Sequence, residues 1–277
     1  MASRTHRTVR SLKLNKLRLT TRDLWLLEGL AKMRFMTTSQ LAKLYFNSSR
    51  WSANKRLRKL LDAGHLKAWV RKLSEENIYS ITRNGIHAIE NENVSLPLET
   101  KIPYSLDGNL EHLLTINDVR TSLALDLPEA NGEILWWRSD WELRSHGRER
   151  IIPDGLFLIK WHGLKDQAYA LEVDNNSKSS RNFLKKILAY ASVQSRGTGI
   201  YQIADPVILV VGSDNKWLGR YRDSAKQLRL QPRLWFATPD DLKDEGAASA
   251  VWLNGAEQKY SLRDLTFLPY SKDSSCP

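Results

Sequence analysis

Cysteine is almost absent from this sequence, and no hydrophobic run is long. The single cysteine, Cys276, excludes a disulfide framework and a cysteine-based zinc site. The longest apolar runs, such as residues 207–211, are far too short to cross a bilayer. The Arg-rich N-terminus also lacks the apolar stretch of a secretory signal. We therefore expect a soluble, cytoplasmic protein that makes no membrane contact.

Several catalytic signatures are also missing. The sequence contains no G-x-S-x-G nucleophile elbow and no glycine-rich loop of the kind that cradles phosphates, so neither serine-hydrolase nor nucleoside-triphosphatase chemistry is expected. No second histidine lies at metal-ligand spacing from His112, which we interpret as a packed or capping residue. With 277 residues, of which 42% are hydrophobic, the chain can form one large domain or two modest ones.

Positive charge is concentrated at one end of the chain. Residues 1–90 hold 19 of the 42 Lys and Arg residues but only 6 of the 31 Asp and Glu residues. The remainder is close to neutral, with 23 basic and 25 acidic residues. A solvated charged surface is the alternative interpretation, but the same third also has the pattern of a nucleic-acid-binding domain. We therefore expect a polyanion to bind this region.

Three helical segments follow a basic arm. Thr20 with Asp23 and Thr37 with Gln40 each form the pattern of a capping box, which marks the start of a helix. A third helix is expected after residues 48–49, and Gly64 is a natural residue to end it. Each helix carries apolar residues at helical spacing, so the three are expected to pack together.

Two β-like runs follow the third helix, at residues 66–70 and 77–81, joined by the charged turn 71–76. Three helices followed by a basic hairpin predict a winged helix-turn-helix domain, a fold that places one helix in the major groove of DNA. We therefore expect double-stranded DNA as the partner of the N-terminal region.

The third helix predicts which side chains contact DNA. Read at 100° per residue, it turns Ala53, Leu57 and Leu60 inward. Arg and Lys on the opposite side have the length and charge to meet guanine acceptors or phosphates, and the sequence leaves open which of them read bases. The predicted DNA-binding residues of this helix and of the hairpin tip are Trp51, Ser52, Lys55, Arg56, Arg58, Lys59, Arg71 and Lys72.

The rest of the chain predicts a second domain with a mixed sheet. Helices are expected at about 109–125, 181–193 and 214–228, with strands near 134–138, 151–159, 169–173, 206–211 and 233–237. Mixed helices and strands with early hairpin-like connections indicate an α+β or α/β unit. The predicted boundaries are a flexible basic arm (1–19), the winged helix (20–91), a linker (92–108), the mixed-sheet domain (109–265) and a tail (266–277).

Three carboxylates mark a candidate site in the second domain. Asp154 precedes an apolar strand, and Glu172 and Asp174 alternate on the next one, where side chains two apart share a face. If the three converge, oxygen ligands without Cys or His suit a hard cation, Mg²⁺ or Mn²⁺. Such an ion can stabilise the charge of a phosphodiester under attack. The competing interpretation is a common Pro-Asp-Gly turn beside a solvated sheet end.

Pro153-Asp154 followed by Glu172-x-Asp174 resembles the PD-(D/E)xK nuclease superfamily. The wider order is similar to the replication-relaxation family of plasmids, phages and integrative elements: a winged helix, a PDG strand, an LEVD strand, then a helix with Lys186 and Tyr190. The resemblance covers roughly residues 20–240. It implies a restriction-endonuclease-like fold in which Asp154, Glu172 and Asp174 hold the metal ion.

One departure from the superfamily pattern bears on activity. Cleaving members usually carry a lysine two residues after the glutamate, where this chain has Asp174. Some members move the lysine to the next helix, where Lys186 is the better candidate, Lys185 points away, and Lys178 in the preceding loop comes second. Other relatives use an acid on the helix that enters the domain, a position that Glu111 matches, although a surface glutamate is the simpler interpretation.

Two functions remain open at this stage. The chain is either a mobile-element or host DNA-binding protein with a metal-dependent nuclease, or a non-catalytic regulator of transcription, replication or transfer with a degenerate nuclease fold. In the second case that fold would serve dimerisation or partner binding. A homodimer on a palindromic site, and a separate replication, transfer or nuclease partner protein, are compatible with either.

Overall fold

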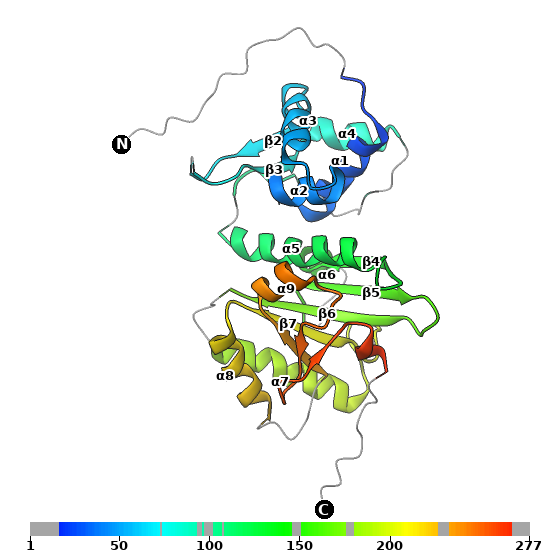
Figure 1. Ribbon diagram of the computed structural model, residues 1–277, viewed down its shortest axis with the longest axis vertical. Coiled ribbons are helices and arrows are strands. Elements are labelled where there is room, and N and C mark those ends of the chain that lie inside the picture. The colour runs from blue at the N-terminus through cyan, green and yellow to red at the C-terminus, as the bar shows by residue number, and fades with distance from the viewer. Residues whose placement is uncertain are drawn as a thin grey trace, which may run out of the picture. The chain divides into compact units, whose positions relative to one another are not determined.

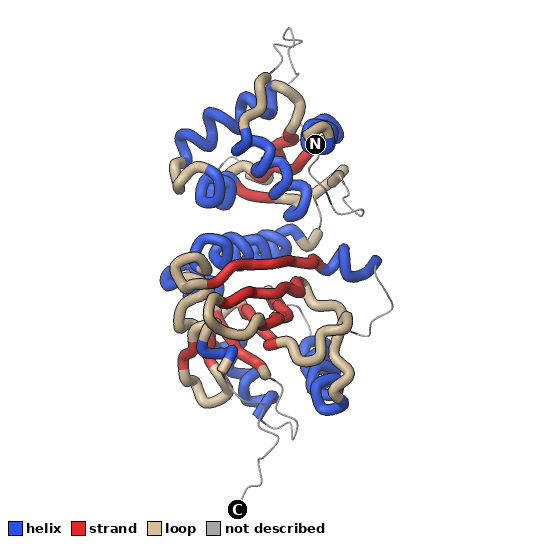
Figure 2. The backbone as a smooth tube through the Cα atoms, turned by 90° about the vertical axis from the view of Figure 1, so that its right-hand side faces the viewer, coloured by secondary structure: helices blue, strands red, loops and turns tan. Residues whose placement is uncertain are grey.

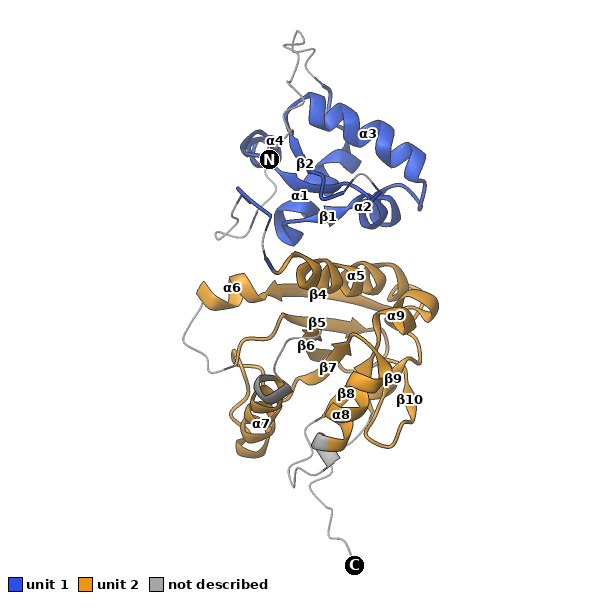
Figure 3. Ribbon diagram, turned by 90° about the vertical axis from the view of Figure 1, so that its left-hand side faces the viewer, with its two compact units in different colours: residues 1–108 blue, residues 109–277 orange. Residues whose placement is uncertain are grey.

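The chain divides into two compact units, residues 1–108 and 109–277 (Figure 3). The computed structural model describes residues 17–72, 74–92, 96, 102–106, 108–145, 151–175, 180–226 and 233–267. The predicted basic arm before residue 17, most of the linker, Lys178 and the tail after residue 267 with Cys276 lie outside the described residues. Within the described ranges, no helix is both long and apolar enough to span a membrane.

The first unit packs helices against a small antiparallel sheet (Figure 1). Its elements are α1 (Thr21–Met33), β1 (Met36–Thr37), α2 (Thr38–Tyr45), α3 (Arg50–Asp62), β2 (Leu66–Trp69), β3 (Ile78–Ile81) and α4 (Arg83–Glu90). The sheet order is β1-β3-β2, with β2 and β3 forming a hairpin. The predicted succession of three helices and a hairpin is present, and α4 is an addition that the sequence analysis did not predict.

Local capping chemistry explains where these helices begin. Thr20 and Asp23 form a complete capping box at α1, and Thr37 and Gln40 form a second one at α2, as predicted. Ser49 caps α3 by accepting a hydrogen bond from the backbone of Ser52. Behind these caps, leucines of α1, α2 and α3 such as Leu30 and Leu57 are completely buried in one core.

The second unit is built on a seven-stranded mixed sheet (Figure 2). Its elements are α5 (Leu110–Asp126), β4 (Gly132–Ser139), α6 (Asp140–Ser145), β5 (Gly155–Trp161), β6 (Gln167–Asp174), α7 (Ser180–Arg196), β7 (Val207–Gly212), α8 (Asn215–Lys226), β8 (Leu234–Ala237), α9 (Pro239–Glu245), β9 (Trp252–Leu253), β10 (Lys259–Tyr260) and a 3₁₀ turn at Asp264–Thr266. The strand order is β10-β9-β8-β7-β6-β5-β4. Strands β6, β7 and β8 are parallel, and the remaining neighbours pair antiparallel.

Helices cover both faces of this sheet (Figure 1). One core joins α5 and α9 to one face, and a second joins α6, α7 and α8 to the other. Strand β7, buried at every position, lies at the centre and consists of Val, Ile and Leu before its final glycine. A central parallel strand covered on both faces requires this continuous apolar run.

Parts of the second unit were not predicted. The sheet continues beyond β8 into the short strands β9 and β10, whereas the sequence analysis ended the sheet at residue 237. Helices α6 and α9 were also missed, because each spans seven residues or fewer and gives too few turns for a periodic signal. Trp137 belongs to the core of this unit, where its ring stacks on Phe157 with centroids 4.5 Å apart.

Candidate functional site

The pairing of β5 and β6 positions two of the predicted carboxylates. In the antiparallel register Gly155 pairs with Leu171, so the next position outward brings Asp154 beside Glu172. Residues directly opposite on adjacent antiparallel strands point to the same side of the sheet. The two acids therefore lie close enough that the charge of Asp154 raises the pKa of Glu172.

Asp154 is fixed at the start of β5 from several directions. Its backbone N–H donates to Leu171 at 3.0 Å, and its Oδ2 accepts from the backbone N–H of Val173 at 2.8 Å. The residue that follows must be glycine, because a Cβ at Gly155 would lie 2.5 Å from the ring of Trp137. The close approach of this ring explains the Pro-Asp-Gly sequence better than a turn does, since Gly155 already belongs to the strand.

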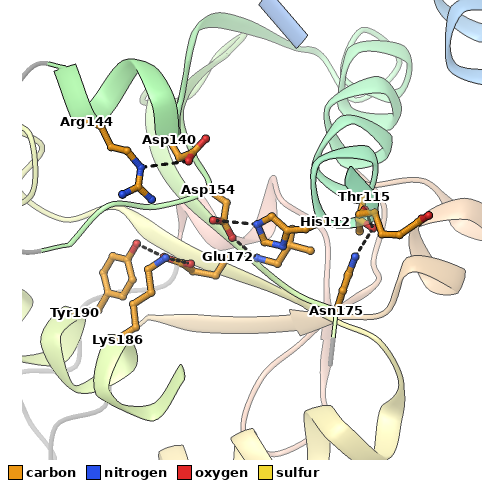
Figure 4. A network of polar contacts seen from close by, with 11 residues as sticks. His112, Thr115, Asp140, Arg144, Asp154, Glu172, Asn175, Lys186 and Tyr190 are labelled. Carbon is orange, nitrogen blue, oxygen red and sulfur yellow. Dashed lines mark hydrogen bonds and ion pairs between the residues drawn. The ribbon is translucent and has the colours of Figure 1, made fainter. Parts of the chain in front are cut away.

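Glu172 is engaged by two side chains from one face of α7 (Figure 4). Lys186 Nζ forms an ion pair with its Oε2, and the hydroxyl of Tyr190 donates to its Oε1 at 2.6 Å. The two residues are spaced i, i+4, so they share one face of the helix and reach the same carboxylate. The neighbouring Lys185 is exposed, as the helical angle predicted.

A histidine that the sequence analysis set aside completes the group. His112, on α5, places its Nε2 3.3 Å from Asp154 Oδ1 (Figure 4). The two residues are 42 positions apart, and only the packing of α5 over β5 and β6 reveals the contact. The other acid considered on this helix, Glu111, is exposed, in line with the simpler interpretation of a surface residue.

The electrostatics of the group follow from burial and from two facing acids. Burial, together with the Asp154 charge, raises the pKa of Glu172 to about 7 although Lys186 opposes the shift. Burial also acts to raise the pKa of Asp154, but His112 and Lys186 outweigh it and the pKa is lowered. The carboxylates likewise outweigh burial at His112 and at Lys186, whose pKa values are both raised. A pair of acids with divergent pKa values is typical of functional sites.

Asp174 is held by different partners. Its Oδ2 accepts from Trp217 Nε1 at 3.0 Å and from the hydroxyl of Tyr221, both on α8. The side chain is buried, and the pKa of Tyr221 is raised by burial and by this carboxylate. The structure therefore brings Asp154, Glu172 and Lys186 together but engages Asp174 with another helix.

The two-acid arrangement limits how a cation could be held. Among the described residues, no group of three or more His, Cys, Asp and Glu side chains is arranged to hold a metal ion. Asp154 and Glu172 alone still supply the carboxylate oxygens that Mg²⁺ and Mn²⁺ prefer, so their chemistry fits a hard cation. The Mg²⁺ or Mn²⁺ site with Asp174 as a third ligand remains a prediction from the sequence.

The exposed face of α3 carries part of the predicted DNA-contacting set. The ring of Trp51 is 72% exposed, and the ammonium of Lys55 lies 5.0 Å from its centroid. Lys59 is exposed on the following turn. Arg58 is exposed too and forms an i, i+4 pair with Asp62 at 3.1 Å, an arrangement that contributes little to stability.

Two predicted contact residues of α3 have structural roles. Arg56 turns inward, where its Nε donates to Asp23 Oδ1 at 2.7 Å and its NH2 also pairs with Asp23. The hydroxyl of Ser52 accepts from Ser49 at 3.0 Å as part of the helix cap. The sequence analysis placed both residues by helical angle alone. The partner of Arg56, Asp23, lies 33 positions away and gave no local signal.

The hairpin tip carries the remaining two residues. Arg71 and Lys72 both pair with Glu75, at 2.9 Å and 3.0 Å. Lys72 is 74% exposed, and its pairing lowers the pKa of Glu75 through a hydrogen bond first and charge second. The tip therefore exposes basic side chains whose partner is a surface acid.

A comparison with protein families bears on both units. The family described as replication-relaxation matches residues 27–211, which is more than half of the chain and covers parts of both units. No curated protein and no solved structure gives a significant match. The resemblance inferred from the sequence is therefore confirmed at the level of the family, and this chain belongs to the replication-relaxation family.

Proposed function

We propose that this protein binds duplex DNA through a winged helix-turn-helix formed by the first unit and cleaves DNA with a PD-(D/E)xK-like site in the second. The observation that carries the proposal is the convergence of Asp154, Glu172 and Lys186 from three separate elements. Two acids and a lysine in contact are the donor set of that nuclease superfamily. The lysine comes from α7 instead of the strand position that Asp174 occupies.

The first unit has the features expected of a DNA reader. Its element order, α1, α2, α3 and the β2–β3 hairpin, is that of a winged helix. Lys55 and Lys59 are exposed on α3, and Lys72 is exposed on the hairpin. In this proposal α3 enters the major groove, and the hairpin contacts a neighbouring stretch of backbone.

Removal of the cations of α3 tests DNA binding. The triple variant Lys55→Ala, Arg58→Ala and Lys59→Ala should bind duplex DNA much more weakly than the wild type. For each phosphate contact that is lost, about 0.9 fewer counterions are released when the protein binds DNA. The slope of log K against log salt should therefore become less steep by about 0.9 per lost contact. Lys243→Ala, an exposed lysine of α9, is the control. Unchanged affinity and slope in the triple variant would exclude α3 as the DNA-binding element.

The residues of the candidate cleavage site have separable roles. Asp154 and Glu172 would hold Mg²⁺ or Mn²⁺, which when bound would stabilise the negative charge of the phosphodiester under attack. Lys186 would position and polarise the attacking water with its ammonium. Tyr190 orients the Glu172 carboxylate, and His112 orients that of Asp154.

A matched pair of lysines tests cleavage. Supercoiled, linear and single-stranded DNA are incubated with the full chain and Mn²⁺. Glu172→Gln should abolish product while leaving duplex affinity intact, and Lys186→Ala should slow cleavage by roughly a hundred-fold or more, as for a lost charge-stabilising group. Lys185→Ala, one position away and exposed, should cut like the wild type. A wild-type protein that yields no product on any substrate contradicts the nuclease proposal.

A second candidate function is favoured by one observation. All four carboxylate oxygens of Asp154 and Glu172 already have protein partners, namely His112, the Val173 backbone, Lys186 and Tyr190. A fully satisfied network can serve as a rigid platform. The protein would then be a non-catalytic regulator of transcription, replication or transfer, whose second unit serves a homodimer or a partner protein. Unchanged duplex affinity in a protein that never cuts would support this alternative.

A further inference from the structure

The structure redistributes the side chains of α3 that are available to DNA. Arg56 donates a hydrogen bond to Asp23, and the hydroxyl of Ser52 belongs to the helix cap, so neither side chain is available on the exposed face. The side chains that remain exposed lie at positions spaced i, i+3, i+4 and i+7, and they form a strip along one side of the helix. It contains Trp51, Asn54, Lys55 and Arg58, and Asn54 is a residue that the sequence analysis did not consider.

Asn54 has the chemistry that the rest of the strip lacks. It is exposed, and within the described part of the chain its side-chain amide has no hydrogen-bond partner. An amide presents a donor and an acceptor side by side, which matches N7 and N6 of adenine in the major groove. The lysines, by contrast, are point charges suited to phosphates or to guanine acceptors.

The arginines that could read guanine are directed elsewhere. Arg56 is bound to Asp23, and Arg58 extends along the helix to Asp62. Arg50, at the first position of α3, lies 3.7 Å from Glu76. A bidentate arginine contact with guanine would first require one of these pairs to break, whereas Asn54 needs no rearrangement.

Trp51 supplies an apolar surface next to Asn54. The two residues are three positions apart, so they are neighbours on the helix surface. The Trp51 ring is 72% exposed and carries Lys55 over one face, which leaves an apolar ring edge beside the amide. Apolar side chains contact the thymine methyl group in the major groove, and this methyl belongs to the same base pair as the adenine.

We propose that Asn54 and Trp51 together read one A·T base pair in the major groove, Asn54 through the adenine and Trp51 through the thymine methyl. This inference rests on the proposed DNA-binding role of α3. It assigns sequence preference to two uncharged residues and leaves phosphate attraction to Lys55, Arg58 and Lys59. The two contributions can therefore be measured separately.

The test selects binding sites from a randomised duplex library with the full chain. The wild type should select a site with an adenine that Asn54→Ala no longer prefers. Replacing that adenine by 7-deazaadenine, which lacks N7, should weaken wild-type binding by about five- to 150-fold and leave the variant unaffected. Replacing the paired thymine by deoxyuridine should weaken the wild type but not Trp51→Ala. Asn84→Ala, an exposed asparagine of α4, is the matched control and should select the wild-type site.

The outcomes distinguish base reading by Asn54 and Trp51 from the proposed DNA binding by α3. Position 54 is exposed, and Asn54→Ala introduces a better helix former, so the variant should fold normally. If Asn54→Ala selects the wild-type site, or if the wild type selects no adenine, the assignment is wrong. DNA binding by α3 still stands in that case, provided that the triple lysine and arginine variant loses affinity. If the triple variant binds like the wild type, the proposed function itself fails.

Discussion

Asp23 in the first unit and Glu172 in the second are buried acids with nearly the same contacts. Each pairs with a cation from a different element, Arg56 of α3 for Asp23 and Lys186 of α7 for Glu172. Each also accepts a hydroxyl hydrogen bond of 2.6 Å, from Thr20 or Tyr190. Their pKa values nevertheless move in opposite directions: that of Asp23 is lowered, and that of Glu172 is raised to about 7.

The difference comes from how strongly burial acts on each acid and from which groups face it. Burial acts to raise the pKa of Asp23, but the guanidinium fork of Arg56 and the hydroxyl and backbone of Thr20 outweigh it. Burial is the largest influence on the pKa of Glu172, its cation is a point-charge lysine, and a second carboxylate, Asp154, raises the pKa further. An acid whose partners outweigh its burial stays charged and can hold a fold together, whereas a deeply buried acid that also faces a second carboxylate can bind a proton near neutral pH.

Loss of Arg56 should have the largest effect on stability. Arg56→Ala leaves Asp23 buried without its cation, which typically costs about 3–5 kcal/mol. The loss should be confined to residues of the first unit, as hydrogen exchange of peptides from the full chain can show. DNA affinity should fall only under conditions in which the first unit unfolds, because Arg56 faces Asp23 instead of solvent.

An exposed arginine provides the control for this prediction. Arg58→Ala removes a solvent-exposed pair with Asp62, which is worth about 0–1 kcal/mol. Its exchange pattern should match the wild type while its DNA affinity drops. If Arg56→Ala and Arg58→Ala have equal effects on exchange, the distinction between an inward and an outward arginine is lost.

The same chemical change should have opposite effects in the two units. Asp23→Asn removes a charge that is favoured in the folded state, and should destabilise the first unit by about 2–3 kcal/mol near pH 7. Glu172→Gln removes a charge that is disfavoured there, and should be neutral or stabilise the second unit by on the order of 1 kcal/mol at pH 8 in the presence of a chelator. Lys186 tolerates the change because it is partly exposed and still faces Asp154.

The pH dependence of these two variants follows from the sign of each shift. Because the pKa of Asp23 is lowered, its stabilisation is present above its ordinary value of 3.8 and is lost as pH falls through the folded-state pKa. The pKa of Glu172 is raised from 4.5 to about 7, so the contribution of this residue to the stability of the folded state is complete below pH 4.5 and is lost as pH rises through 7. Urea unfolding, followed in each unit by the proteolytic fragments that it releases, should therefore show that Glu172→Gln is more stable than the wild type at pH 8 and equally stable at pH 4.5.

Sequence reasoning succeeded where interactions are local. The capping boxes at Thr20 and Thr37 join residues three apart, so their pattern is visible in the chain itself. Lys186 and Tyr190 were named from the family resemblance, their i, i+4 spacing puts them on one helix face, and the structure brings both to Glu172. In each case the helical repeat fixes which side chains meet.

Interactions across long sequence separations were beyond its reach. Arg56 meets Asp23, and His112 meets Asp154, only because helices pack in a particular way. Strand alternation correctly put Glu172 and Asp174 on one face, but it could not show that α7 engages the first and α8 the second. Partners for alternate residues of a strand depend on which helix crosses each position, and a strand pattern carries no such information.

The smallest expected effects concern the two hydroxyl groups. Thr20→Ala removes a cap and the 2.6 Å hydrogen bond to Asp23, and should cost the first unit about 1–2 kcal/mol. Tyr190→Phe removes the equivalent bond to Glu172 and should cost the second unit about 1 kcal/mol. By magnitude alone the two variants would be hard to tell apart.

Their pH dependence separates them. Asp23 is ionised throughout the range from pH 5 to 8 because its pKa is lowered, so the cost of Thr20→Ala should stay constant. Glu172 loses its proton near pH 7, and hydrogen bonds to a charged acceptor are the stronger ones, so the cost of Tyr190→Phe should increase over the same range. Urea unfolding of each variant at pH 5 and pH 8 measures both trends. A cost of Tyr190→Phe that does not change with pH would mean that Glu172 keeps one protonation state, and the contrast between the two acids would then disappear.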